Sequence, residues 1–355
     1  MQGLEASQLA AQGRRGLASF RRGGHEFAVR RAGVKSGGGR GRYFRYVIKH
    51  LETGTVFKLT DEARSEDQTP NVLAELGSSF LMASGGIGSA WAEVKNILEA
   101  LGGYVLWDKL ARVDMCADFP GLNMAVLHDL IVNQDLAITY AQNRASYRQC
   151  SRETGLSIGT GAISLRIYDK AYEVRVKKPD AVKRTLLEQL RWGGPQEFAV
   201  RVEFQLRREL LVTALAGDLS SYARRRGDLA GYLTSDWFRI ADSAPDRQNN
   251  NTQRAAVHPL WQDVQAAFAA WAGQPVEKIR RERLRADKDP IRLFKQGLGC
   301  LVSVCAELDD APPASAGELL AKINELVAWG IGRCDEVELL RLYEQKRLER
   351  GSRGH

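Results

Sequence analysis

Three stretches of the chain alternate apolar and polar residues, which is the pattern of β-strands buried on one face only. Residues 112–119 read RVDMCADF, residues 163–168 read ISLRIY, and residues 200–206 read VRVEFQL. Every second residue in them is apolar, and the residues between are mostly charged or polar. We therefore predict three strands of an antiparallel sheet, each with one face on a hydrophobic core and one polar face.

Further strands and helices are predicted around these three. Strands are predicted at residues 42–50, 55–59, 72–76, 79–83, 109–119, 162–169 and 197–206, and helices at 87–101, 123–132 and 181–191. Beyond Arg207 the pattern is helical almost throughout. The fold class that follows is α+β, with a central antiparallel sheet, flanking helices and a mainly helical C-terminal region.

The positive charge of the chain is concentrated at its N-terminus. The net charge is +8 over 355 residues, but residues 1–50 hold eleven Lys and Arg against two Glu, while the rest of the chain is nearly neutral. The N-terminal stretch is also rich in glycine, and such a segment follows a phosphate backbone more readily than it folds alone. We predict a flexible basic arm at 1–41, a folded domain at 42–242 that contains the three patterned strands, a linker at 243–253 and a helical region at 254–355. The alternative for the arm is a leader that only keeps the chain soluble.

Several classes of protein are disfavoured by what the sequence lacks. No apolar run approaches the ~20 residues that cross a bilayer, and no charged-then-apolar leader opens the chain, so we expect no membrane partner. The five cysteines are scattered without a CxxC pair, which disfavours zinc and fits a reducing cytoplasm. No Gly-Lys-Ser/Thr follows the glycines near residue 159, which disfavours a nucleoside triphosphatase.

The polar faces of the three strands share one arrangement of side chains. In each, an arginine is followed two residues later by an acidic residue or a tyrosine: Arg112 and Asp114, Arg166 and Tyr168, Arg201 and Glu203. Carboxylates suit a hard cation, arginines bind phosphate oxygens, and a tyrosine oxygen can attack phosphorus. Neighbouring strands of this kind would form a site for a metal and a phosphate. A solvated face held by cross-strand ion pairs is the alternative interpretation.

The same motifs resemble the replication initiation factor family. They are ARVDMCADF at 111–119, GTGAISLRIYDKAYE at 159–173 and VRVEFQLRREL at 200–210, in the family's order, and the resemblance spans residues 40–215 approximately. The family contains rolling-circle initiators of small plasmids, replication proteins of filamentous phages and some relaxases of integrative conjugative elements. The resemblance implies a variant of the HUH-endonuclease architecture.

The resemblance also implies an enzyme that nicks one DNA strand at an origin to start rolling-circle replication. Tyr168 would be the nucleophile that forms a 5′-phosphotyrosyl intermediate, and Arg166 and Lys170 would favour the phenolate and stabilise the phosphoryl oxygens. Tyr172 is a second candidate nucleophile, but the strand parity that runs up to Tyr168 favours the first. A conjugative relaxase with the same chemistry and a non-enzymatic origin-binding regulator are alternative functions.

The metal that the resemblance implies is Mg²⁺ or Mn²⁺. The sequence contains no His-hydrophobic-His pair, so acidic residues would have to hold the ion. The implied ligands are Asp114 and Glu203, with Glu173 as a third or Asp118 in its place.

The expected partner is origin DNA, single-stranded or extruded as a cruciform at the nick site. Arg112 and Arg201 on the sheet, Arg40 in the arm and Arg42 directly after it are the expected DNA contacts. A host helicase and polymerase would continue replication from the nick, in the cytoplasm of a bacterial host.

Overall fold

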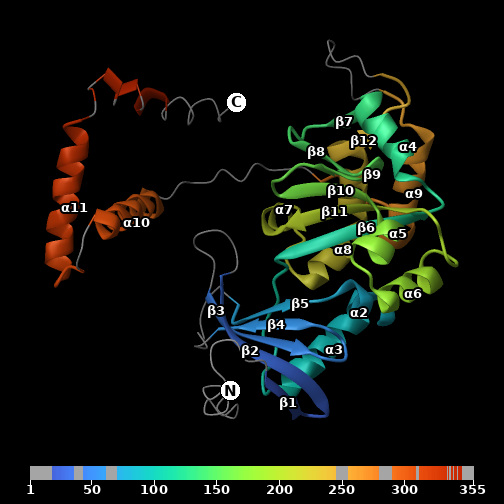
Figure 1. The fold of residues 1–355 in the computed structure, drawn as a ribbon, viewed down its shortest axis with the longest axis horizontal. Helices are drawn as coiled ribbons and strands as arrows, with labels where there is room; N and C mark the ends of the chain where they lie inside the picture. The colour runs from blue at the N-terminus through green and yellow to red at the C-terminus, as the bar shows by residue number, and fades with distance from the viewer. Residues whose placement is uncertain are drawn as a thin grey trace. The chain divides into compact units, whose positions relative to one another are not determined.

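The computed structural model describes six long stretches of the chain and four short ones after them (Figure 1). These are residues 18–35, 43–60, 70–244, 255–279, 290–308 and 312–333, followed by 335, 337–338, 340–341 and 343–345. The chain divides into two units, Met1–Glu282 and Arg283–His355. The described part of the second unit is helical, with α10 (Pro290–Leu308) and α11 (Ala316–Ile331).

The first five strands form an antiparallel sheet in chain order. They are β1 (Ala18–Arg22), β2 (His25–Lys35), β3 (Tyr43–His50), β4 (Val56–Leu59) and β5 (Val72–Glu75). Two helices follow, α2 (Ser78–Ala83) and α3 (Ile87–Ala100). Buried residues of the strands and of α3 form one core, including Phe27, Ile48, Phe57, Val94 and Ile97.

The structure differs from the sequence prediction at the expected flexible arm, because residues 18–35 form β1 and β2. Phe27 and Val29 are buried in the core of this sheet, so the segment does contribute apolar surface to a fold. Gly23 and Gly24, which suggested flexibility, make the tight turn between the strands with φ of 58° and 84°. The rest of the expected arm lies outside the described residues.

A second difference is at residues 79–83, predicted as a strand, which lie in α2. A short apolar run carries no period that separates a strand from a helix. The strands predicted at 42–50, 55–59 and 72–76 and the helix at 87–101 are confirmed within a few residues by β3, β4, β5 and α3.

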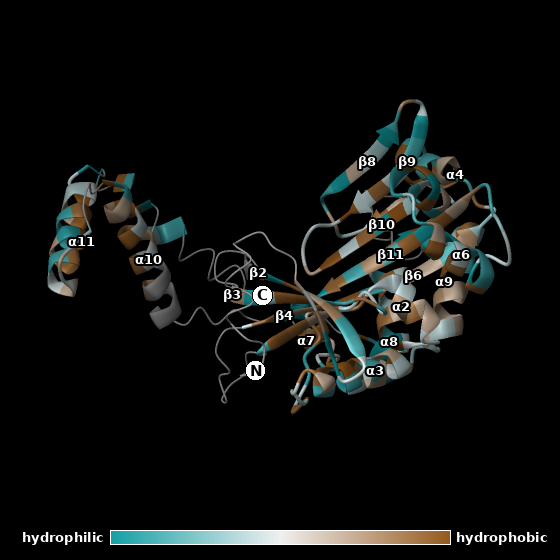
Figure 2. Ribbon diagram, turned by 60° about the horizontal axis from the view of Figure 1, so that its bottom comes forward, coloured by the Kyte–Doolittle hydropathy of each residue, from teal (hydrophilic) through white to brown (hydrophobic). Residues whose placement is uncertain are grey.

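The second sheet contains the three patterned strands side by side. Its order is β6 (Arg112–Pro120), β11 (Ala199–Arg207), β10 (Ile163–Asp169), β9 (Arg152–Ile158) and β8 (Arg144–Gln149), and all neighbours are antiparallel. The strands β8 and β9 were not predicted from the sequence. In Figure 2, β10 and β11 carry many hydrophobic residues, whereas β8 at the sheet edge is mainly hydrophilic.

The apolar face of the second sheet is covered by helices. They include α4 (Met124–His128), α8 (Leu219–Gly231) and α9 (Pro259–Ala272). Phe204 of β11 packs against the rings of Trp237 and Phe268, with centroid distances of 6.1 and 5.6 Å. Because Phe268 belongs to α9, this helix completes the core of the first unit, and the boundary between the units comes after residue 282 rather than near 254. Most of the predicted linker lies outside the described residues.

Short elements complete the first unit. They are α5 (Lys170–Tyr172), α6 (Ala181–Leu190), α7 (Arg208–Thr213) and the pair β7 (Ala137–Thr139) and β12 (Phe238–Ile240). Among the described residues, no helix is long and apolar enough to span a membrane. The predicted fold class, an α+β chain with antiparallel sheets, flanking helices and a helical C-terminal part, is confirmed.

Candidate active site

The polar face of the second sheet joins the predicted nucleophile to a predicted metal ligand. Tyr168, the penultimate residue of β10, donates a hydrogen bond from its hydroxyl to Oε2 of Glu203 on β11, at 3.0 Å. The guanidinium of Arg166 lies 3.8 Å from Oε1 of the same carboxylate. The Glu203 side chain is 12% exposed and that of Arg166 is 48% exposed, so solvent reaches the site from the arginine side.

The environment of Tyr168 keeps its hydroxyl protonated at neutral pH. Burial, and then the negative charge of Glu203, raise the pKa of the phenol above its ordinary value, and the nearby Arg201 only partly opposes them. The phenol can therefore become a nucleophile only if its proton passes to an acceptor during the reaction. Glu203 Oε2 is already placed to accept that proton.

Arg201 and Asp118 form a buried ion pair, which removes both from their predicted roles. The guanidinium of Arg201 donates to the two oxygens of Asp118 at 2.5 and 2.8 Å, and the side chains are 5% and 2% exposed. Trp192 Nε1 donates to Asp118 as well, at 3.2 Å. Burial alone would raise the pKa of Asp118, but these hydrogen bonds and the charge of Arg201 hold it below its ordinary value. Arg201 is thus a structural partner of β6 and not an exposed DNA contact.

Lys170 and Glu173, also predicted for the site, bind each other after the end of β10. The ammonium of Lys170 donates to Oε2 of Glu173, and the Lys170 side chain is 2% exposed. Burial, followed by the charge of Arg201, lowers the pKa of Lys170. The Lys170 ammonium lies 5.3 Å from the centre of the Tyr168 ring. Lys170 is therefore a buried side chain that contacts the ring of Tyr168.

Tyr172, the alternative nucleophile, lies in the short helix α5. The carboxylate of Asp169 accepts from the backbone N–H of Tyr172 at 2.8 Å and so caps that helix. The guanidinium of Arg152, which also donates to Asp169, lies 4.8 Å from the centre of the Tyr172 ring. The prediction that Tyr168 lies at the end of the strand is confirmed by β10. The carboxylate of Glu203 accepts its hydrogen bond from Tyr168.

Asp114 is the other predicted ligand on the polar face. Its carboxylate accepts from Nε and Nη2 of Arg112 at 2.7 and 2.5 Å, and this hydrogen bonding raises the pKa of the guanidinium. Arg112 is 49% exposed, so it remains within reach of a ligand in solvent. Asp114 stands opposite Gln205, two residues along β11 from Glu203, so both carboxylates lie on one face of neighbouring strands.

The two carboxylates Asp114 and Glu203 fit Mg²⁺ or Mn²⁺ in part. Mg²⁺ is often held by one or two carboxylates, with water and substrate phosphate as its other ligands. Within the described residues, Asp114, Glu203 and Glu173 do not form a group with their ligand atoms close together. The described side chains therefore fit a metal site with two carboxylate ligands, Asp114 and Glu203. Glu173 is ion-paired with Lys170 instead.

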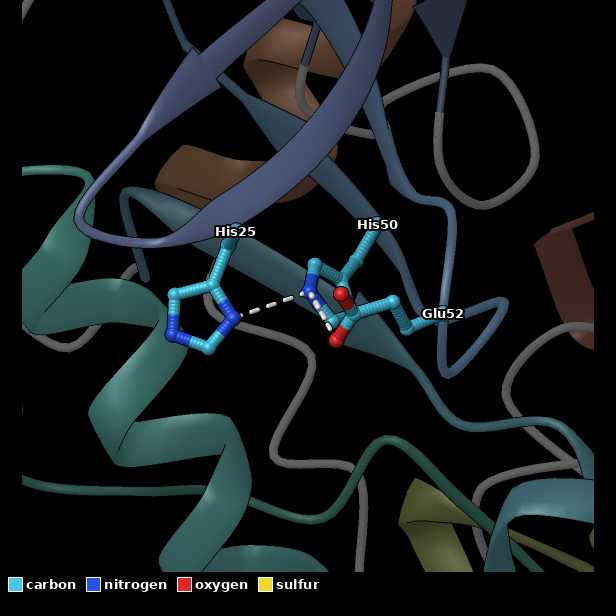
Figure 3. A group of neighbouring side chains, drawn as sticks. All are labelled: His25, His50 and Glu52. Atoms are coloured by element: carbon cyan, nitrogen blue, oxygen red, sulfur yellow. Dashed lines mark hydrogen bonds and ion pairs between the residues drawn. The ribbon is translucent and has the colours of Figure 1, made fainter.

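A close group of metal-ligand side chains does occur in the first sheet. His25, His50 and Glu52 each offer one ligand atom, and these atoms lie within 4.8 Å of one another (Figure 3). The sequence does not predict this group, because a His-hydrophobic-His motif places both histidines on one strand. His25 and His50 come together only through the pairing of β2 with β3.

Comparisons with known proteins give one match. No protein-family model and no curated protein matches the chain. The match is a solved structure, a rolling circle replication initiator protein from Geobacillus stearothermophilus, with 13% identity and a TM-score of 0.41 over 68% of this chain and 83% of that one. That protein is of the class that the strand motifs resemble. At this level of similarity, the match assigns neither family nor chemistry to the present chain.

Proposed function

We propose that this protein initiates rolling-circle replication by nicking one strand of origin DNA with Tyr168. The observation that carries the proposal is the hydrogen bond between the Tyr168 hydroxyl and Glu203, on a sheet face that also presents Arg166. A phenol, its proton acceptor and a phosphate-binding group are the parts that a tyrosine phosphotransfer requires.

The reaction begins with transfer of the Tyr168 proton to Glu203. The phenolic oxygen attacks the scissile phosphorus, a phosphorus–oxygen bond forms to Tyr168, and the bond from phosphorus to the 3′ oxygen breaks. The leaving 3′ oxygen takes up a proton and becomes a free 3′-OH. The 5′ end of the DNA stays on the enzyme as a phosphotyrosyl ester, so the same site can later rejoin ends.

The other groups of the polar face bind the phosphate. Arg166 is half exposed beside Glu203, where its guanidinium can donate to the phosphoryl oxygens and stabilise their growing charge. Arg112, also half exposed, can bind a neighbouring phosphate of the strand. A divalent cation held by Asp114 and Glu203 would supply Lewis-acid polarisation of the scissile phosphate.

The proposed substrate is a single-stranded or extruded segment of the origin. A base-paired duplex restrains the backbone that the half-buried Tyr168 has to reach in line. The free 3′-OH would then prime a host polymerase, with a host helicase opening the duplex, in the cytoplasm of a bacterial host. We infer these partners from the reaction product, because a free 3′-OH is the substrate of a polymerase.

A cleavage assay on unselected DNA tests the proposal. The protein is incubated with Mn²⁺ and a pool of single-stranded oligonucleotides that carry a randomised central segment. We expect cleavage of a subset with a common motif, and no cleavage by Tyr168→Phe or in EDTA. A pool that the protein binds and leaves intact would support the non-enzymatic origin-binding regulator instead.

A further inference from the structure

His25, His50 and Glu52 lie together where β2 begins and β3 ends. Nδ1 of His25 is 3.1 Å from Nε2 of His50, and a carboxylate oxygen of Glu52 is 3.9 Å from the same Nε2 (Figure 3). His25 follows the β1–β2 turn, and Glu52 is in the turn that leads to β4. The three side chains therefore come from three consecutive parts of the first sheet.

The spacing of these atoms is suited to a tetrahedral ion. With metal–nitrogen bonds of about 2.0–2.1 Å, neighbouring ligands of a tetrahedral site lie roughly 3.3 Å apart. The His25–His50 separation is close to that value, and the exposed side chain of Glu52 has only a short distance to move. Two imidazoles and one carboxylate are ligands typical of Zn²⁺ and its neighbours in the transition series.

A hydrogen-bond chain orients His50 as a ligand. Its other ring nitrogen, Nδ1, lies 2.8 Å from Oγ1 of Thr53, whose hydroxyl donates onward to Thr55 at 2.9 Å. When Nδ1 carries the ring proton and donates to Thr53, Nε2 keeps its lone pair for an ion. The backbone N–H of Thr53 makes a longer contact with Nδ1, at 3.3 Å, which requires the opposite tautomer.

The side chain of His50 is fully buried, which fixes the ring beside His25.

We propose that His25, His50 and Glu52 bind a divalent transition-metal ion, Zn²⁺ by their ligand chemistry. The ion ties the β1–β2 hairpin to the end of β3 and to the turn after it. Its role is structural, because the site belongs to the first sheet and Tyr168 to the second. The free energy of binding then adds to the stability of the first sheet.

Cobalt binding tests the site directly. Tag-free full-length protein is titrated with Co²⁺ in excess Mg²⁺, which fills the carboxylates of the nicking site. We expect one Co²⁺ per chain with the visible absorption of a tetrahedral ion, displaced by Zn²⁺. Zn²⁺ should also raise the Tm. DNA is not needed, so the result is independent of whether the protein nicks.

Variants separate a metal site from a hydrogen-bonded histidine pair. His25→Ala removes a ligand that is not fully buried and should abolish the absorption band and the Tm shift. Thr53→Val keeps all three ligands but removes the partner of Nδ1, and should weaken binding by about 10–100-fold. His128→Ala, which changes a histidine of α4 outside the group, should bind Co²⁺ as the wild type does. Absence of a cobalt band in the wild type, or an equal affinity in His25→Ala, would overturn the proposal.

Discussion

Tyr168 and Glu203 are joined by a hydrogen bond of 3.0 Å although they do not stand opposite each other in the sheet. In the register of β10 and β11, Tyr168 faces Arg201 and Glu203 faces Arg166. The contact is diagonal, and it forms because Arg201 turns away to Asp118 on the next strand. One carboxylate is thereby shared by the phenol and by Arg166, which is the arrangement that the proposed chemistry uses.

The first prediction concerns the hydroxyl of Tyr168. Tyr168→Phe should remove DNA cleavage completely, because the attacking oxygen is lost. The ring and its contact with Lys170 remain, so the free energy of unfolding should fall by about 1.5–3 kcal/mol, the net contribution of one hydrogen bond to a charged group. Cleavage assays and thermal unfolding measure the two effects. Tyr172→Phe is the matched control, and retention of cleavage by Tyr168→Phe with loss in Tyr172→Phe would reverse the assignment.

The second prediction concerns the cation at the polar face. Asp114→Asn removes one charged oxygen ligand, so the Mn²⁺ concentration that gives half-maximal cleavage should rise, with partial recovery at high Mn²⁺. Cleavage should stop in EDTA and return when Mn²⁺ is added in excess. Full activity in EDTA would show that the reaction needs no cation. His25→Ala is the control, because His25 belongs to the metal-ligand group of the first sheet. We expect its cleavage to depend on Mn²⁺ as that of the wild type does.

The third prediction concerns the buried pair of Asp118 and Arg201. Asp118→Asn should lower the free energy of unfolding by about 3–5 kcal/mol, because it leaves a buried guanidinium without its counter-charge. Chemical denaturation at pH 7 measures the loss. An exposed pair makes a suitable comparison, and Glu26→Gln, which breaks the surface pair with Arg21, should cost less than about 1 kcal/mol.

The pH dependence of this pair has a definite sign. The pKa of Asp118 is lower in the folded chain than in the unfolded one, so the stabilisation is fully present above the unfolded pKa of about 3.9. It is lost as pH falls through the folded value. The stability difference between wild type and Asp118→Asn should therefore stay constant from about pH 7 to 5 and shrink below pH 4. A difference that is unchanged at the lowest pH at which both proteins still fold would contradict the ion pair.

The fourth prediction concerns Arg40 and Arg42, which lie outside the described residues. If both contact phosphates, Arg40→Gln with Arg42→Gln should weaken binding to unrelated duplexes alike. The slope of log K against log salt should fall by about 1.8, at 0.9 for each contact on B-DNA. Fluorescence anisotropy at several salt concentrations measures the slope. An unchanged slope would show that this segment contacts no phosphate.

Strand parity in the sequence was sufficient to predict the polar face of the second sheet. Val202 and Glu203, for example, lie on opposite faces in the structure, with Val202 fully buried in the core. Parity does not give register or partner choice, so the pairing of Arg201 with Asp118, 83 residues apart, could not be foreseen. Without this pairing, the sequence alone indicates a DNA contact for Arg201 and a metal ligand for Asp118.

The first sheet was the harder part to predict. Its hairpin lies in a stretch whose glycines and arginines indicated an unfolded arm, although Phe27 and Val29 alternate as strand residues do. His25 and His50 are 25 positions apart and become neighbours only when β2 pairs with β3. A search of the sequence for hairpins on both sides of Gly23 and Gly24 would have found the strands, but not the contact between the two rings.

The most direct test of the central claim is to find which side chain carries the DNA. The protein is incubated with Mn²⁺ and the randomised single-stranded pool, the covalent complex is isolated in detergent, and the digest is analysed by mass spectrometry. Trypsin cuts after Arg166 and Lys170, so Tyr168 lies in the peptide IYDK and Tyr172 in a separate peptide, AYEVR. The account predicts a nucleotide adduct on IYDK that is absent from Tyr168→Phe. An adduct on AYEVR or on any other peptide, or bound DNA with no adduct at all, would contradict it.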